Sequence, residues 1–184
     1  AGVAAIQIED QIFPKRCGHA KGVEVCDIQE MLKRIGVATE SRNSENFLII
    51  ARTDSRLELG LEEAIKRAEA YSEAGADLIF VESPQTVDEM KILKQSIKTP
   101  LVFKMVPDGN LSDLSSKALA DMGFSILIYP TLGFLSAANA IQQAFNELKT
   151  TGLVKKQTMQ RFDEFSNMIG FDEIYSFEDR WDDQ

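Results

Sequence analysis

The chain has 184 residues, and its 44% hydrophobic composition is enough for one buried core. Its formal net charge of -9 argues against nucleic acid or an anionic membrane as a partner, because either would repel an acidic surface. Two cysteines do not make a disulfide framework, and no apolar run approaches membrane-spanning length, so we expect reduced thiols in the cytoplasm or an organelle.

The first predicted strand ends in two carboxylates. Residues 2–8 are almost all apolar or small, which is typical of a parallel strand buried on both faces. Glu9 and Asp10 follow at its carboxyl end. Because the chain starts without methionine and directly in this strand, we expect an upstream part to be missing.

A basic loop around Cys17 follows this strand. Pro14 and Gly18 predict a loop rather than a further helix or strand. Positively charged neighbours favour the thiolate, which makes Cys17 a candidate acid, base or nucleophile. An exposed cysteine with incidental basic neighbours would fit the same pattern. The basic neighbours are Lys15, Arg16 and His19, the only histidine of the chain.

A scaffold helix and a second apolar strand are predicted next, and this strand, like the first, ends in polar residues. After Asp27, a good N-cap, apolar side chains recur at helical spacing to residue 35 and predict a scaffold helix. Residues 47–51 predict a second buried strand that ends at Arg52. Such strand ends are typical of barrels and doubly wound sheets, whose ligands bind beyond the carboxyl ends of the strands. Arg52 is therefore a candidate ligand-binding residue, although an ordinary loop arginine would also fit.

A helix is predicted from Gly60 to about residue 74. Its apolar side chains share one face, which we expect to pack on the core. Its charged pairs four residues apart, Glu62 with Lys66 and Glu63 with Arg67, are expected to form a solvated face and not a site.

Three further strands are predicted after this helix. The strand at 78–81 ends at Glu82, the strand at 101–103 is followed by Lys104, and a fifth strand is predicted at 124–129. Helices fill the intervals between these strands. This regular alternation of strands and helices is the spacing of a βα-barrel.

Three short patterns together resemble one enzyme family. Ile-Glu-Asp-Gln at 8–11 is followed by Lys-Arg-Cys-Gly-His at 15–19, and Ala-Arg-Thr-Asp stands at 51–54. Their order resembles the signature of the isocitrate lyase and phosphoenolpyruvate mutase superfamily. It is most similar to the 2-methylisocitrate lyase branch, which has carboxyvinyl-carboxyphosphonate phosphorylmutase-like members, and Glu82 resembles the family's site glutamate.

The resemblance implies an α/β fold, the (β/α)8 TIM-type barrel. The chain would hold about the last five strands, with residues 1–150 as a partial catalytic barrel. Residues 151–184 would be a C-terminal helical tail that packs between subunits of a homotetramer. In the family an earlier strand carries an Asp-x-Asp-Thr-Gly-Tyr-Gly motif whose aspartates hold Mg²⁺, and this sequence lacks that motif. We therefore expect a C-terminal part of a member, inactive by itself.

The resemblance also implies a carbon-carbon lyase that depends on Mg²⁺ or Mn²⁺. The complete enzyme would cleave a 2-hydroxy or 2-oxo di- or tricarboxylic acid, such as 2-methylisocitrate, a dimethylmalate or oxaloacetate. The products would be pyruvate or another 2-oxo acid and a carboxylate. Glu9 would bind the metal, and Cys17, His19 and Arg52 would be catalytic, with Cys17 as proton donor to the departing carbanion. Substrate contacts would come from Lys15, Arg16, Gly18, Glu82 and Lys104.

Two alternatives stay open. One is a relative of phosphoenolpyruvate mutase or phosphonopyruvate hydrolase, against which the Cys-Gly-His loop argues, since those relatives lack it at this place. The other is a non-enzymatic product, a truncated barrel whose strands serve only assembly.

The sequence departs from its tricarboxylate-cleaving relatives where they bind far carboxylates. An asparagine of the family falls at Lys104 or Met105, and an arginine after the last barrel strand falls at Leu135. Each lost charged contact to a buried carboxylate weakens binding by roughly 2 to 5 kcal/mol. We therefore expect a preference for a smaller acid, such as an alkylmalate or an oxaloacetate-like dicarboxylate, over 2-methylisocitrate.

Overall fold

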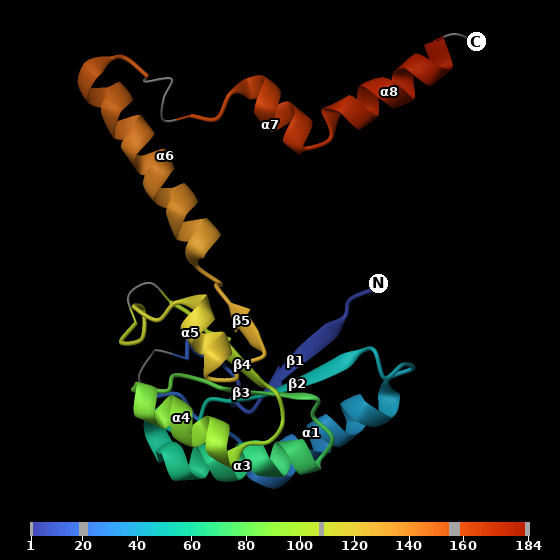
Figure 1. Cartoon of the computed structure of the whole chain (residues 1–184), viewed down its shortest axis with the longest axis vertical. Coiled ribbons are helices and arrows are strands. Elements are labelled where there is room, and N and C mark those ends of the chain that lie inside the picture. The colour runs from blue at the N-terminus through green and yellow to red at the C-terminus, as the bar shows by residue number, and fades with distance from the viewer. Residues whose placement is uncertain (1, 19–21, 107–108, 155–158, 183–184) are drawn as a thin grey trace. The chain divides into compact units, whose positions relative to one another are not determined.

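A computed structural model describes residues 2–18, 22–106, 109–154 and 159–182 (Figure 1). The chain forms two compact units, Ala1–Leu132 and Gly133–Gln184. The first unit alternates strands and helices, and the second is helical. None of the described helices is both long and apolar enough to cross a membrane.

The first unit is built on a five-stranded parallel sheet in which the spatial order of the strands follows the chain order. Successive strands are joined by helical connections, as in the barrel predicted from the sequence. The predicted α/β fold, a partial TIM-type barrel with five strands, is therefore confirmed. The strands are β1 (Ala5–Glu9), β2 (Leu48–Thr53), β3 (Leu78–Val81), β4 (Leu101–Lys104) and β5 (Ile126–Ile128).

Helices cover one face of this sheet, where Figure 1 shows α1, α3 and α4 along the same side. Asp27 caps α1 as predicted, because its side chain accepts a hydrogen bond of 2.8 Å from the amide of Gln29. The main core lies between these helices and the sheet, and Ala51 and Ile79 lie fully buried in that layer. The helices of the unit are α1 (Ile28–Ser41), α2 (Arg56–Leu59), α3 (Leu61–Glu73), α4 (Val87–Ser96) and α5 (Ser116–Asp121).

The opposite face of the sheet carries a second, smaller apolar cluster. Leu78, Phe80 and Val102 form it, and they alternate along their strands with residues of the main core. The same two-residue alternation places the polar residues at the carboxyl ends of the strands. This face therefore leads directly to the site described below.

Strand β1 differs from its prediction. A buried strand was expected, but β1 is half-buried to exposed along its length, and Ile6 is 37% exposed. The strand lies at an edge of the sheet and pairs with β2 on one side only. An apolar run predicts the strand itself, whereas its burial depends on neighbours that the run does not specify.

The prediction that the charged pairs of α3 face solvent is wrong for Arg67, which is only 6% exposed. Position 67 is three residues after Ala64 and four before Tyr71, so it shares their buried face. Arg67 keeps its expected partner Glu63 at 3.0 Å, but its guanidinium also reaches Asp10 at 3.2 Å, inside the core.

The second unit consists of α6 (Leu132–Thr151), α7 (Phe162–Met168) and α8 (Phe171–Asp182). The predicted apolar stripe at 162–169 lies on α7 and just after it, and its side chains are exposed. Phe162 is 84% exposed and Met168 is 66% exposed. Trp181, on α8, is 60% exposed.

We expect the 184-residue chain to self-associate when it is produced by itself. Its sheet ends in two edge strands, β1 and β5, and its second unit exposes large apolar side chains. Both features favour pairing with another chain. Sedimentation velocity over a tenfold concentration range measures this, and a concentration-independent monomer with cooperative unfolding would contradict the expectation.

Candidate active site

The site is built at the carboxyl ends of the strands, on the face opposite the helices. Glu9 pairs with Arg52 in the β1–β2 register, and Arg52 pairs with Phe80 in the β2–β3 register. Paired residues of parallel strands point to the same side of a sheet, and so do residues two apart in one strand. Glu9, Arg52 and Glu82 therefore lie on one face, and Lys104 joins them from β4.

Arg52 is the centre of this group. Its guanidinium makes a bidentate contact with Asp54, at 2.8 Å from Nε and 2.7 Å from Nη2. The same Nη2 lies 3.1 Å from Glu82 Oε2, and Nε lies 3.7 Å from Glu9 Oε2. The guanidinium also lies over the Phe80 ring, 5.0 Å from its centroid. Fixed by three carboxylates and a ring, Arg52 presents a positive charge in a defined place.

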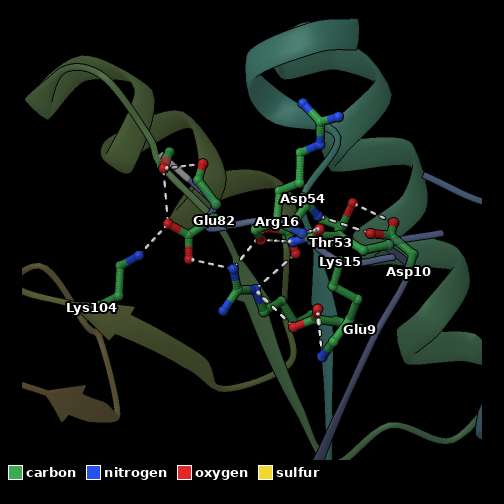
Figure 2. A network of polar contacts seen from close by, with 12 residues as sticks. Glu9, Asp10, Lys15, Arg16, Thr53, Asp54, Glu82 and Lys104 are labelled. Atoms are coloured by element: carbon green, nitrogen blue, oxygen red, sulfur yellow. Dashed lines mark hydrogen bonds and ion pairs between the residues drawn. The ribbon is translucent and has the colours of Figure 1, made fainter. Parts of the chain in front are cut away.

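Glu82 joins Arg52 to Lys104, and Figure 2 shows its dashed contact to Lys104. Its side chain is only 1% exposed. Burial opposes its ionisation, but the charge of Arg52 and the hydrogen bond from Lys104 outweigh burial and hold the pKa of Glu82 below its usual value. Glu82 therefore stays ionised at neutral pH.

The pKa of Asp54 shifts in the opposite direction to that of Glu82, although both carboxylates contact Arg52. Burial raises the pKa of Asp54, and the neighbouring charges of Glu82 and Glu9 add to that rise, against the lowering effect of Arg52. The two carboxylates that contact Arg52 therefore have pKa values shifted in opposite directions.

The loop that carries Cys17 lies against this group. Gly18 is buried, and a Cβ at its position would lie 2.7 Å from Arg52 Nη2 and 2.9 Å from Asp54 Oδ1. Only a hydrogen fits there, so Gly18 permits a close approach of the loop to the site. Lys15 lies 2.9 Å from Glu9 Oε1, while Cys17 itself is exposed.

The predicted site residues of the loop are thus partly brought together. Gly18 and Lys15 contact the group around Arg52 directly, as Glu82 and Lys104 also do. Arg16 is held by its backbone, through the side chain of Gln11. His19 lies outside the described residues.

Asp10 is a structural residue that the sequence interpretation missed. Its carboxylate is fully buried and accepts hydrogen bonds from four donors. The donors are the Thr53 hydroxyl at 2.7 Å, the Asp54 amide at 2.9 Å, the Tyr71 hydroxyl at 2.8 Å and Arg67 at 3.2 Å. Alternation could have found it: if Glu9 faces the site, Asp10 faces the helices, where a carboxylate needs a partner.

A cavity of about 220 Å³ opens beside Glu82 and Lys104. Its wall is half apolar, with Phe80, Phe103 and Val106 among the lining residues. Among the described residues that line it, Lys104 is the one cation, and Glu82 already pairs with it. The cavity therefore offers shape and apolar contact rather than several positive charges.

Glu9 is the described residue that best fits a metal ligand. It lies at the carboxyl end of β1 with its side chain 14% exposed, and carboxylate oxygens suit Mg²⁺ and Mn²⁺. Within the described ranges, no group of three or more His, Cys, Asp and Glu residues is placed to hold a metal ion. Glu9 is thus a strand-end carboxylate that could supply one oxygen, directly or through water, to such an ion.

Comparison with known proteins shows which family this chain matches. The model of the family described as phosphoenolpyruvate phosphomutase matches residues 1–149. The 2,3-dimethylmalate lyase of Eubacterium barkeri is 40% identical over 182 residues, which cover 97% of this chain and 62% of that protein. The 2-methylisocitrate lyase of Bacillus subtilis (strain 168) is 40% identical over 156 residues, which cover 85% of this chain and 51% of that protein.

Solved structures agree with the sequence comparison. A crystal structure of 2,3-dimethylmalate lyase, described as a PEP mutase/isocitrate lyase superfamily member, matches with a TM-score of 0.89 and 32% identity, covering 97% of this chain and 60% of that one. Phosphonopyruvate hydrolase in complex with oxalate and Mg²⁺ matches with a TM-score of 0.84 and 30% identity, covering 98% and 63%. The chain thus spans between about half and two thirds of the length of these proteins.

Proposed function

This chain belongs to the phosphoenolpyruvate mutase/isocitrate lyase superfamily, and from that premise we propose that its full-length protein is a carbon-carbon lyase acting on a small 2-hydroxy dicarboxylic acid. The observation that carries the proposal is the close seating of Gly18 on the group of Arg52, Asp54 and Glu82. This seating brings the cysteine loop beside a fixed positive charge at the carboxyl ends of the strands. A relative of phosphonopyruvate hydrolase would not need a thiol there.

Cys17 is the proton donor in this proposal. When the C2 hydroxyl of a 2-hydroxy acid gives its proton to water or a base, C2 becomes the carbonyl carbon of a 2-oxo acid and the C2–C3 bond breaks. Oxaloacetate has no C2 hydroxyl and would react as its C2 hydrate, which leaves oxalate in place of the 2-oxo acid. The electron pair of that bond passes to C3, and the Cys17 thiol gives its proton to C3, leaving a thiolate. In the condensation direction the thiolate removes that proton again. Exposure of Cys17 in the described structure is compatible with access by substrate.

Arg52 and Lys104 provide the positive charges that a dicarboxylate needs. Arg52 is held by Asp54 and Glu82, so it stabilises negative charge on substrate without reorganising. Lys104 borders the cavity beside the group and would contact the second carboxylate. Lys15, Arg16, Gly18 and His19 belong to the loop that would cover the bound acid and exclude water.

Glu9 would contribute to a Mg²⁺ or Mn²⁺ site that is completed by ligands outside the described residues. When bound, such an ion polarises the oxo-acid oxygens and lowers the energy of negative charge on them. The Mg²⁺ in the phosphonopyruvate hydrolase complex and the carboxylate of Glu9 at a strand end support this assignment. We also propose that the second unit packs against neighbouring subunits, because its apolar side chains are exposed.

The cavity beside Lys104 favours a short, alkyl-bearing acid. A tricarboxylate would place a third carboxylate against a wall that contains Phe80, Phe103 and Val106 and no cation besides Lys104 among its described residues. The polar residues of this wall other than Glu82 and Lys104, among them Gln85, Asn110 and Ser112, are neutral, so a third carboxylate would lack a charged partner there, whereas a methyl group fits beside the apolar residues. A dimethylmalate-like or oxaloacetate-like acid is therefore the proposed substrate class.

The experiment compares specificity constants of the full-length protein for four acids with Mg²⁺ present. We expect 2,3-dimethylmalate and oxaloacetate to exceed isocitrate and 2-methylisocitrate by at least about 30-fold, because one missing charged contact costs about 2 kcal/mol or more. Chelation of the metal should stop turnover. Preference for either tricarboxylate would overturn the substrate class, and turnover of phosphonopyruvate without carbon-carbon cleavage of any hydroxy acid would overturn the lyase.

A further inference from the structure

The cysteine loop leaves the sheet and returns to it through a narrow neck of backbone hydrogen bonds. The Ile12 amide donates to the Glu24 carbonyl at 2.9 Å, and the Cys26 amide donates to the Asp10 carbonyl at 2.8 Å. Between them, Gln11 and Val25 form an isolated antiparallel bridge. The neck fixes both ends of the loop, but it lies several residues from Cys17.

Gln11 belongs to this neck, and its side chain also contacts the loop that the neck closes. Its side chain is buried, with the residue only 3% exposed, and makes two hydrogen bonds to the backbone of one residue, Arg16. Gln11 Nε2 donates to the Arg16 carbonyl at 3.0 Å, and the Arg16 amide donates to Gln11 Oε1 at 2.9 Å. A primary amide has a donor and an acceptor side by side. It can therefore pair with both the carbonyl and the amide of Arg16, as the backbone of a neighbouring strand would.

Gly18 supplies the second fixed point, since its backbone is seated against Arg52 and Asp54. Cys17 therefore lies between a residue clamped by an amide and a residue fixed by packing. From this arrangement we propose that Gln11 is a positioning residue for Cys17, which holds the thiol where it can exchange a proton with substrate. The proposal rests on the proposed function, in which Cys17 is the proton donor.

Two substitutions separate the hydrogen bonds from the bulk of the side chain. Gln11→Leu keeps a buried side chain and removes both hydrogen bonds, so the loop can move away from its place. Gln11→Glu keeps the acceptor for the Arg16 amide, but an ionised carboxylate has no donor for the Arg16 carbonyl. A misplacement of about 1 Å can cost about 100-fold in rate, so we expect kcat to fall by about 10- to 100-fold with little change in KM.

The division of the effect between kcat and KM gives a readout that general damage to the fold would not produce. Neither substitution touches Arg52 or Lys104, the proposed substrate-binding cations, so KM should change little while kcat falls. A loss that appears in KM with kcat unchanged would overturn the proposal.

A double-mutant cycle tests whether Gln11 acts through Cys17. Gln11→Leu should lower kcat in the unsubstituted protein and add almost nothing in a Cys17→Ser background, because the group that it positions is gone. Equal losses in both backgrounds would overturn the proposal. Gln29→Leu, at an exposed glutamine in the first turn of α1, is the matched control and should leave kcat unchanged.

Hydrogen exchange of the Arg16 amide tests the contact between Gln11 and Arg16 without a measurement of turnover. The Arg16 amide donates to Gln11, so its exchange should accelerate in Gln11→Leu, and unchanged exchange would overturn the proposal. Absence of lyase turnover in the unsubstituted full-length protein would refute the proposed function, while this measurement would still decide whether Gln11 fixes the residue before Cys17.

Discussion

Replacing Cys17 by serine is expected to lower kcat for carbon-carbon cleavage by about 10²- to 10⁴-fold in the full-length protein, the usual contribution of a positioned acid or base. The hydroxyl is a much weaker acid than the thiol, so the departing carbanion no longer receives its proton in time. Glu9 and Arg52 are untouched by the substitution, because Cys17 contributes to neither of their ion pairs. Mg²⁺ and pyruvate should therefore bind with nearly unchanged affinity in a calorimetric titration.

Cys26→Ala is the matched control for this experiment. Cys26 is 3% exposed in the main core, and burial raises the pKa of its thiol, which keeps it protonated and unreactive. Removing this thiol should leave kcat close to that of the unsubstituted protein. Loss of Mg²⁺ or pyruvate binding together with the Cys17 thiol would contradict the assignment of metal binding and proton transfer to different residues.

The strands of the first unit could be predicted because parallel strands appear in a sequence as short apolar runs. The runs at 47–51, 78–81 and 101–103 all form strands, and each leads to a polar residue of the site. Parallel order brings the carboxyl ends to one edge of the sheet, so Arg52, Glu82 and Lys104 meet there although 52 residues separate the first from the last. Their meeting follows from topology and needs no long-range information.

The buried network around Asp10 could not be predicted in the same way. Asp10 and Arg67 are 57 residues apart, and their contact depends on how α3 packs on the sheet. The sequence of α3 offers Arg67 a partner on its own helix, Glu63, and that local pair hides the second one. The prediction that β1 is buried was wrong for a related reason, because an edge strand and a central strand can have the same apolar pattern in the sequence.

The Gly18 and Gln11 contacts show a different limit of sequence reasoning. A glycine in a loop predicts a turn, but the need for a hydrogen at Gly18 comes from Arg52 and Asp54, which pack against it from another strand end. The glutamine after Asp10 belongs to the pattern that resembles the family, yet the pattern does not say what its amide holds. Both contacts depend on how the loop folds against the ends of the strands, which the sequence pattern does not specify.

The largest effect on stability is expected at Asp10. Asp10→Asn should lower the free energy of unfolding by about 3 to 5 kcal/mol, because Arg67 loses one of its two carboxylate partners and the buried Tyr71 and Thr53 hydroxyls lose a charged acceptor. Asparagine has nearly the same shape, but its NH₂ group would face donors from Arg67, Tyr71 and Thr53 instead of accepting from them. Urea unfolding of the full-length protein measures the change.

Two further variants provide smaller reference values for comparison. Tyr71→Phe removes one of the four donors to Asp10 and should cost about 1 to 2 kcal/mol, because three donors remain. Asp121→Asn breaks an exposed pair with Lys117 on α5 and should cost about 0.5 kcal/mol or less. Asp10 also fixes the Asp54 amide at 2.9 Å, and Asp54 holds Arg52, so Asp10→Asn should lower kcat as well as stability. A cost for Asp10→Asn as small as that for Asp121→Asn would mean that Glu63 alone compensates the charge of Arg67 and that the network does not organise the site.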